Sequence, residues 1–409
     1  MLNPLIRLGA LGQSPWYDFI TRDLIASGEL ARLIREDGLR GMTTNPTIFE
    51  KAIAGSDLYD EEIRRLSAGG ARPAAVFEAL AVADVRAACD LFLPVHRQSA
   101  GVDGLVSIEV SPTLAHDAAG TIREAERLWQ RIARPNVMIK IPGTAEGLAA
   151  ITHCLAQGIN VNVTLLFAVR RYREVVDAFF SGLEQRAAAG QPLEGIASVA
   201  SFFVSRLDGK VDPLVGPDGP RARAAIGNAA LAYQAFEELF SSARWQALAA
   251  LGAMDQRPLW ASTSTKDPAL PDVYYVEALV AEETVNTLPP ATFAAYRDHG
   301  RPELRIREAL AEAPALFADL ARREAQPVVE IPPGQVGGRA PLETCPQPPC
   351  PRRVALRSQP PHEAGARHPV EDHADGLPEQ APVVGTLGQC APRPGSKRPQ
   401  HDRAERFAV

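Results

Sequence analysis

The sequence predicts a (β/α)8 barrel, that is, a TIM barrel of the α/β class, for most of its 409 residues. Between about Trp16 and Leu288, eight short apolar segments alternate with longer amphipathic segments. Polar side chains recur near the carboxyl ends of these short segments, where the functional loops of such a barrel begin. A doubly wound parallel sheet is the second architecture that this alternation allows.

Each strand candidate is a short run rich in β-branched, aromatic or other apolar residues. In chain order the candidates are 15–18, 41–46, 104–110, 136–142, 159–167, 197–208, 257–265 and 272–280. The clearest helical patterns between them are Ile122, Ala125, Leu128, Trp129 and Ile132, and Val169, Tyr172, Val175, Val176 and Phe179. Gly158 and Gly190 follow two of the helical segments between strand candidates, as expected where a helix ends.

The composition is that of an ordinary globular protein that acts on small molecules. Hydrophobic residues make up 46% of the chain and the net charge is -6, which offers no basic surface for nucleic acid. The opening residues lack an uninterrupted apolar signal core, and no later segment reaches membrane-spanning length. Cysteines form no zinc or disulfide pattern. We therefore expect a cytoplasmic protein that binds neither nucleic acid nor membrane, with its oligomeric state left open between monomer and homo-oligomer.

The composition changes abruptly after Gln326. Sixteen of the 35 prolines and four of the eight histidines follow this residue, while large apolar residues become scarce. Such a segment buries too little apolar surface to offset the entropy of ordering it. We expect a barrel over residues 1–326 and a disordered, proline-rich tail over 327–409, which a translation out of frame would explain.

Lys140 is unusual because it stands inside the apolar strand candidate "NVMIKIPGT". A lysine held among apolar groups has a lowered pKa, and its neutral amine can attack a ketone to form a Schiff base. The alternative is a structural lysine paired with a carboxylate. Asp18 and Glu109, at the ends of two other strand candidates, favour the chemical role because Schiff-base chemistry on a sugar needs acid and base groups.

Other polar residues near the strand ends are candidates for binding a substrate. Two cations and two hydroxyl groups near the sixth and seventh strands could hold a phosphate, whereas Walker A and GxGxxG motifs are absent from the sequence. No histidine cluster or metal-ligand spacing is present in the sequence either. The candidate residues are Asn45, Asn162, Thr164, Ser201, Arg206, Ser264 and Lys266.

Five blocks of the sequence resemble the transaldolase family in its longer bacterial subfamily. They are "GMTTNPTIFEKAI", "VSIEVSP", "NVMIKIPGT", "INVNVTLLF" and "SVASFFVSRLD", and the resemblance extends from about Leu8 to Leu320. It implies a class I aldolase-type barrel that needs no metal or organic cofactor. It departs from this chain at the C-terminus, where the apolar final helix of the family is missing and the proline-rich tail stands instead.

The resemblance implies a role for each candidate residue. Lys140 is the implied Schiff-base lysine, Asp18 acts on the C4 hydroxyl group, and Glu109 and Thr164 hold a catalytic water. Asn45 and Asn162 bind the three-carbon fragment, with Ser201 beside it. The implied phosphate ligands are Arg206, Ser264 and Lys266.

The expected activity is transaldolase, in the non-oxidative pentose phosphate pathway. A dihydroxyacetone unit would pass from sedoheptulose 7-phosphate to glyceraldehyde 3-phosphate through a Schiff base on Lys140. Two alternatives stay open at this point. One is an aldolase that releases dihydroxyacetone, and the other is a catalytically inactive barrel that acts as a binding or scaffold protein.

Overall fold

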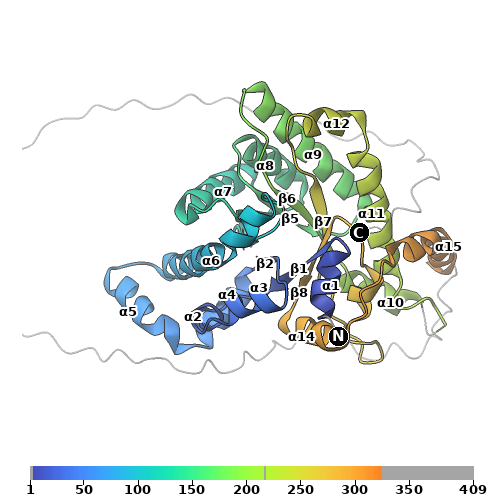
Figure 1. The fold of residues 1–409 in the computed structure, drawn as a ribbon, viewed down its shortest axis with the longest axis horizontal. Coiled ribbons are helices and arrows are strands. Elements are labelled where there is room, and N and C mark those ends of the chain that lie inside the picture. Colours follow the sequence, from blue (N-terminus) through green and yellow to red (C-terminus); the bar gives the residue numbers. More distant parts are fainter. Residues whose placement is uncertain (1–2, 216–217, 325–409) are drawn as a thin grey trace, which may run out of the picture. The chain divides into compact units, whose positions relative to one another are not determined.

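The computed structural model describes residues 3–215 and 218–324. In this part of the chain, eight parallel strands close into a barrel in sequence order, and helices surround it (Figure 1). The (β/α)8 prediction is therefore confirmed. The predicted disordered tail, residues 327–409, lies outside the described residues.

The barrel strands are three to six residues long. They are β1 (Gln13–Asp18), β2 (Gly41–Thr43), β3 (Leu105–Glu109), β4 (Val137–Pro142), β5 (Val161–Leu166), β6 (Ser198–Phe203), β7 (Gln256–Ala261) and β8 (Thr284–Leu288). Strand β1 pairs with both β2 and β8, which closes the barrel.

Helices connect the strands, precede the first strand and follow the last one. They are α1 (Pro4–Ala10), α2 (Arg22–Ala26), α3 (Glu29–Glu36), α4 (Pro46–Ala54), α5 (Asp60–Ala68), α6 (Pro73–Gln98), α7 (Ala118–Ile132), α8 (Ala145–Ala156), α9 (Val169–Ala188), α10 (Ser205–Val215), α11 (Ala224–Phe240), α12 (Ala243–Ala249), α13 (Tyr274–Ala278), α14 (Pro290–His299) and α15 (Ile306–Glu324). Two short 3-10 helices cover Asp57–Tyr59 and Pro112–Leu114.

The helices predicted around Leu128 and Val175 are α7 and α9. The Asp117 side chain accepts from the Gly120 amide at the start of α7. Gly158 and Gly190, two residues beyond α8 and α9, have φ angles of +80° and +69°. Because glycine adopts this left-handed conformation without steric cost, both positions end a helix as predicted.

The second and seventh strands end earlier than predicted, at Thr43 and Ala261, and the sixth and eighth strand predictions were also wrong in detail. The run 272–280 contains helix α13, and the eighth strand lies further on, at Thr284–Leu288. The β-branched and aromatic residues of that run pack around a helical turn, where Tyr275 donates to Asp208 at 2.9 Å. The sixth strand ends at Phe203, so Arg206 belongs to helix α10. Tertiary packing overrides local strand propensity at both places.

Side chains alternate between the helices and the barrel interior where the strands are regular. On β4, Val137, Ile139 and Ile141 pack outward in the main core, whereas Met138 belongs to a separate cluster inside the barrel. Residues of several strands form this inner apolar layer, namely Trp16, Leu105, Met138, Ala197, Val199, Leu259, Ala261 and Val285. Gly41 leaves room for it, because a Cβ there would overlap the Trp16 indole.

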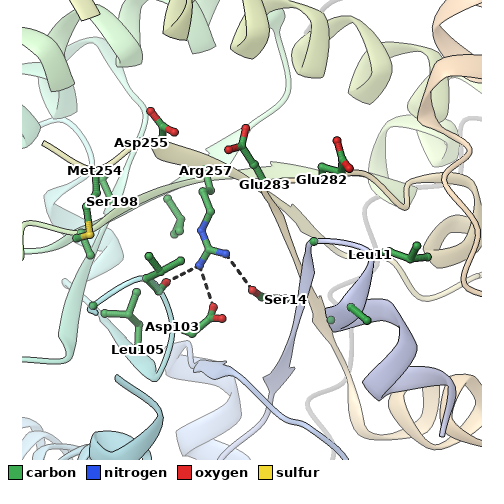
Figure 2. A pocket seen from close by; sticks show the side chains of 17 residues that line it. Leu11, Ser14, Asp103, Leu105, Ser198, Met254, Asp255, Arg257, Glu282 and Glu283 are labelled. Atoms are coloured by element: carbon green, nitrogen blue, oxygen red, sulfur yellow. Dashed lines mark hydrogen bonds and ion pairs between the residues drawn. The ribbon is translucent and has the colours of Figure 1, made fainter. Parts of the chain in front are cut away.

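A buried arginine lies at the amino-terminal end of the barrel, below this layer. Arg257 on β7 is 9% exposed, donates to Ser14 at 2.9 Å and forms an ion pair with Asp103 at 3.0 Å. Its guanidinium also donates to the Val102 carbonyl at 2.6 Å. Figure 2 shows these bonds at the base of a cavity of about 690 Å³, with Asp255, Glu282 and Glu283 beside it.

No helix among the described residues is both long and apolar enough to cross a membrane.

Candidate active site

Lys140 lies on the inner face of β4, above the apolar layer. Its Nζ atom is 3.5 Å from a Glu109 carboxylate oxygen and donates to the Thr44 carbonyl oxygen at 3.4 Å. The residue is only 7% exposed, so its ammonium group does not extend to bulk water. The parallel register places Glu109 directly beside Lys140. This carboxylate offsets part of the cost of burying the charge.

Asp18 ends β1 at the same end of the barrel. One of its carboxylate oxygens accepts from the Thr43 hydroxyl at 2.6 Å, and Thr43 is its register partner on β2. Thr43 and Thr287 also share a hydrogen bond of 2.6 Å. A line of hydroxyl groups from β8 to β2 therefore orients the Asp18 carboxylate.

Asn162 lies on β5 as the register partner of Lys140. Its Nδ2 atom donates to the Ser107 hydroxyl at 2.9 Å, and its Oδ1 atom accepts from the Ser201 hydroxyl at 2.7 Å. Asn162 and Ser201 are 0% and 1% exposed. These bonds fix the amide orientation, and one Nδ2 hydrogen remains available to a ligand.

Thr164, further along β5, is buried without a complete set of partners. It is 1% exposed, and its Oγ1 atom has no hydrogen-bond partner among the described residues. An unsatisfied buried hydroxyl is costly, and in native structures it usually bonds an ordered water or a ligand. The Thr164 hydroxyl is thus suited to hold a water in the site.

Asn45 lies two residues beyond the end of β2, where it caps α4. Its Oδ1 atom accepts from the Ile48 amide at 3.0 Å. Capping by an asparagine satisfies one of the free amides at a helix start. Only the Nδ2 group of Asn45 is then left for a substrate hydroxyl.

The predicted phosphate ligands occupy two segments that backbone contacts hold together. The Ser205 amide at the start of α10 donates to the Ser262 carbonyl after β7 at 3.0 Å. Arg206 is exposed and stacks 4.8 Å from the Phe203 ring centroid, and Lys266 donates to Ser264 at 3.0 Å. The structure gives these two cations separate partners.

A buried carboxylate lies next to the segments that carry these cations. Asp208 on α10 is 2% exposed and accepts from the Ala225 amide at 2.8 Å and from Tyr275 at 2.9 Å. Burial raises the pKa of Asp208 to about 6. A cavity of about 660 Å³ lies between this carboxylate and Lys266.

The structure adds Thr43, Ser107 and Thr287 to the site. Each is 0–2% exposed and donates to or accepts from a predicted site residue or its partner. A signal for Ser107 was present in the sequence, because it precedes Glu109 by two residues and so shares its face of the strand. Thr287 could not be found in this way, because the eighth strand was placed too early.

The side chains around Lys140, above the inner apolar layer, include the chemical groups that amine catalysis requires. A primary amine, two carboxylates from separate strands and an unsatisfied hydroxyl lie at the carboxyl ends of parallel strands. This is the end of a (β/α)8 barrel that carries active sites. The arrangement can support nucleophilic attack by an amine, with acid and base groups nearby.

Comparison with known proteins identifies the family. The family model "Transaldolase/Fructose-6-phosphate aldolase" matches residues 15–327. The chain belongs to this family. It is 52% identical to the transaldolase of Frankia alni over 328 residues, covering 78% of this chain and 88% of that protein. It is 55% identical to the transaldolase of Acidothermus cellulolyticus over 305 residues, with 73% and 82% covered. A cyanobacterial relative, transaldolase 2 of a Nostoc species, is 48% identical over 334 residues, with 78% and 88% covered.

Proposed function

We propose that this protein is a transaldolase that carries a dihydroxyacetone unit as a Schiff base on Lys140. The donor would be sedoheptulose 7-phosphate and the acceptor glyceraldehyde 3-phosphate, in the non-oxidative pentose phosphate pathway. The observation that carries the proposal is the buried Lys140 amine, 3.5 Å from the Glu109 carboxylate, in a chain of this family. A cytoplasmic location is part of the proposal, and it agrees with two free, buried thiols, Cys89 and Cys154.

The first step is attack by Lys140 on the ketone of the donor. The amine must lose a proton to become a nucleophile, and Glu109 is near enough to exchange protons with it directly or through one water. The carbinolamine then loses its hydroxyl group as water to give the iminium. The Thr164 hydroxyl has no hydrogen-bond partner among the described residues, so it is suited to bind the water that would carry the protons.

The second step is cleavage of the C3–C4 bond. Asp18 takes the proton of the C4 hydroxyl group, the bond electrons move to the iminium, and erythrose 4-phosphate leaves. The 2.6 Å bond from Thr43 holds the Asp18 carboxylate in one orientation for this transfer. Asn45 and Asn162 each have amide hydrogens left for the hydroxyl groups of the bound three-carbon unit.

The third step is transfer to the acceptor. The enamine carbon attacks the aldehyde of glyceraldehyde 3-phosphate, the new hydroxyl group recovers a proton from Asp18, and hydrolysis of the iminium releases fructose 6-phosphate. The phosphate groups would be bound by Arg206, Ser264 and Lys266. The side chains of Arg206 and Lys266, which have separate partners here, would then turn toward the same phosphate when a substrate is present.

Borohydride trapping with fructose 6-phosphate tests the proposal. Peptide mass spectrometry should find a reduced three-carbon adduct on Lys140 in the full chain and none in Lys140→Ala. Lys210→Ala, which removes an exposed lysine of α10, is the matched control and should keep the adduct. Folded protein without an adduct would favour the inactive barrel. Dihydroxyacetone release that does not depend on an acceptor would favour the free aldolase.

A further inference from the structure

Strand β5, which carries Asn162, the register partner of Lys140, has a β-bulge. Its register with β6 shifts between Val163 and Leu166, so that Thr164 and Leu165 together face the single residue Ser201. Leu165 has a φ of +61°, in the left-handed region. This conformation is costly for a branched side chain, and a β-bulge is where a strand accommodates it.

The bulge changes which side chains face the barrel. Regular alternation after Asn162 and Thr164 would turn Leu166 inward. Instead Leu166 is fully buried in the outer core, like the outward-facing Phe202 that pairs with it. The inward position opposite Ser201 is therefore shared by Thr164 and Leu165.

The two residues that share this position differ in exposure. Thr164 is 1% exposed, whereas the apolar Leu165 is 43% exposed. A leucine that is 43% exposed and in the left-handed region carries two costs. Glycine or asparagine would avoid both costs at this position. Such a residue at the carboxyl end of a barrel strand points to a contact with a ligand.

We propose that the Leu165 side chain is the apolar wall that shields the Lys140-bound three-carbon intermediate from water. This inference rests on the proposed function. The intermediate has two fates. In transfer, the enamine carbon forms a bond to the acceptor aldehyde. In hydrolysis, the enamine carbon is protonated, water adds to the iminium carbon, and the carbon–nitrogen bond breaks to release dihydroxyacetone and the free Lys140 amine. Leu165 favours transfer because it leaves room for the one water beside Thr164 and excludes others.

The test measures the ratio of dihydroxyacetone released to sedoheptulose 7-phosphate formed, from fructose 6-phosphate and erythrose 4-phosphate. Leu165→Gly keeps the left-handed backbone without strain, and Leu165→Ala keeps the strain without the side chain. Both should raise the ratio about tenfold, at the lower end of the effect of losing apolar contacts in a pocket. Leu165→Met, which is similar in volume, should keep the wild-type ratio. Leu251→Ala is the control, because Leu251 is also an exposed leucine (55%) and lies before β7, at the opposite barrel end.

The outcomes separate this inference from the proposed function. If the wild type forms neither a trapped adduct nor a transfer product, the proposed function fails. If the wild type transfers normally and both small variants, folded by circular dichroism, keep its ratio, Leu165 is not the wall. An increase in Leu165→Gly without one in Leu165→Ala would assign the effect to the backbone, because only glycine relieves the left-handed strain, and would also overturn the inference.

Discussion

The two ends of the barrel each bury one long cationic side chain, with opposite consequences. Arg257 at the amino-terminal end has three partners at 2.6–3.0 Å, from Ser14, Val102 and Asp103. Lys140 at the carboxyl-terminal end has only longer contacts, at 3.4 and 3.5 Å. An arginine with three short hydrogen bonds suits a structural role, whereas the lysine with only long contacts is the group that we propose to react.

The inner apolar layer separates these two environments. Trp16, Met138 and Leu259 are each fully buried between them. Water therefore has no polar route through the middle of the barrel, and the charges at one end act on the other only through a low-dielectric layer. The comparison predicts that changes at one end alter activity and changes at the other alter stability.

The largest expected effect is the loss of activity in Lys140→Met. Removal of the nucleophile should lower kcat for transfer by on the order of 10⁴-fold or more, because the covalent route is lost. The free energy of unfolding should change much less than in the arginine variant below. A coupled transfer assay and urea denaturation check the two quantities. Substantial activity in Lys140→Met would contradict the assignment of the amine.

Arg257→Met should have the opposite profile. It leaves the Asp103 carboxylate, which is only 14% exposed, without its cation. We expect the free energy of unfolding to fall by about 3 kcal/mol, with kcat of the folded enzyme within about twofold of the wild type. Adding Asp103→Asn should recover part of the stability. A large loss of kcat in folded protein would mean that the ends are coupled.

Thr43→Val tests how the carboxyl-terminal end orients its groups. The change keeps the side-chain shape and removes the donor to Asp18. We expect kcat to fall about tenfold, with KM little changed, because the Asp18 carboxylate loses the hydrogen bond that orients it. A coupled transfer assay measures kcat, and an unchanged kcat would indicate that Thr43 has only a packing role.

The smallest effect concerns Asp255 at the amino-terminal end. Burial and the nearby Glu283 raise the pKa of Asp255 from its ordinary value of 3.8 to about 6 in the folded protein. The native state thus favours the protonated form, so this contribution to stability is present below about pH 4 and is lost as the pH rises through about 6.

Asp255→Asn mimics the protonated form. Since the group is partly exposed, we expect it to stabilise the protein by about 1 kcal/mol at pH 8 and to have little effect near pH 4. Urea denaturation at both pH values measures the difference. The same gain at both pH values would exclude the carboxylate charge as its cause.

Much of the fold and the site could be predicted because their signals are local. The alternation of apolar runs with helical patterns indicates a barrel, and Asp18 and Glu109 end their strands as predicted. Lys140 was identified because an ammonium in an apolar run requires an explanation. The eighth strand failed because residues 272–280 have strong strand propensity but pack as a helix around Tyr275.

The sequence by itself determined the barrel, and it predicted the end of the barrel that carries the candidate site and Lys140 as the candidate amine, since each depends on residue type and periodicity. Only the tertiary structure decided the contacts among residues far apart in sequence. Thr287 meets Thr43 across barrel closure, and Thr164 and Leu165 together face Ser201 because of a register shift. Strand register and barrel closure depend on the packing of the whole chain, and no local pattern specifies them.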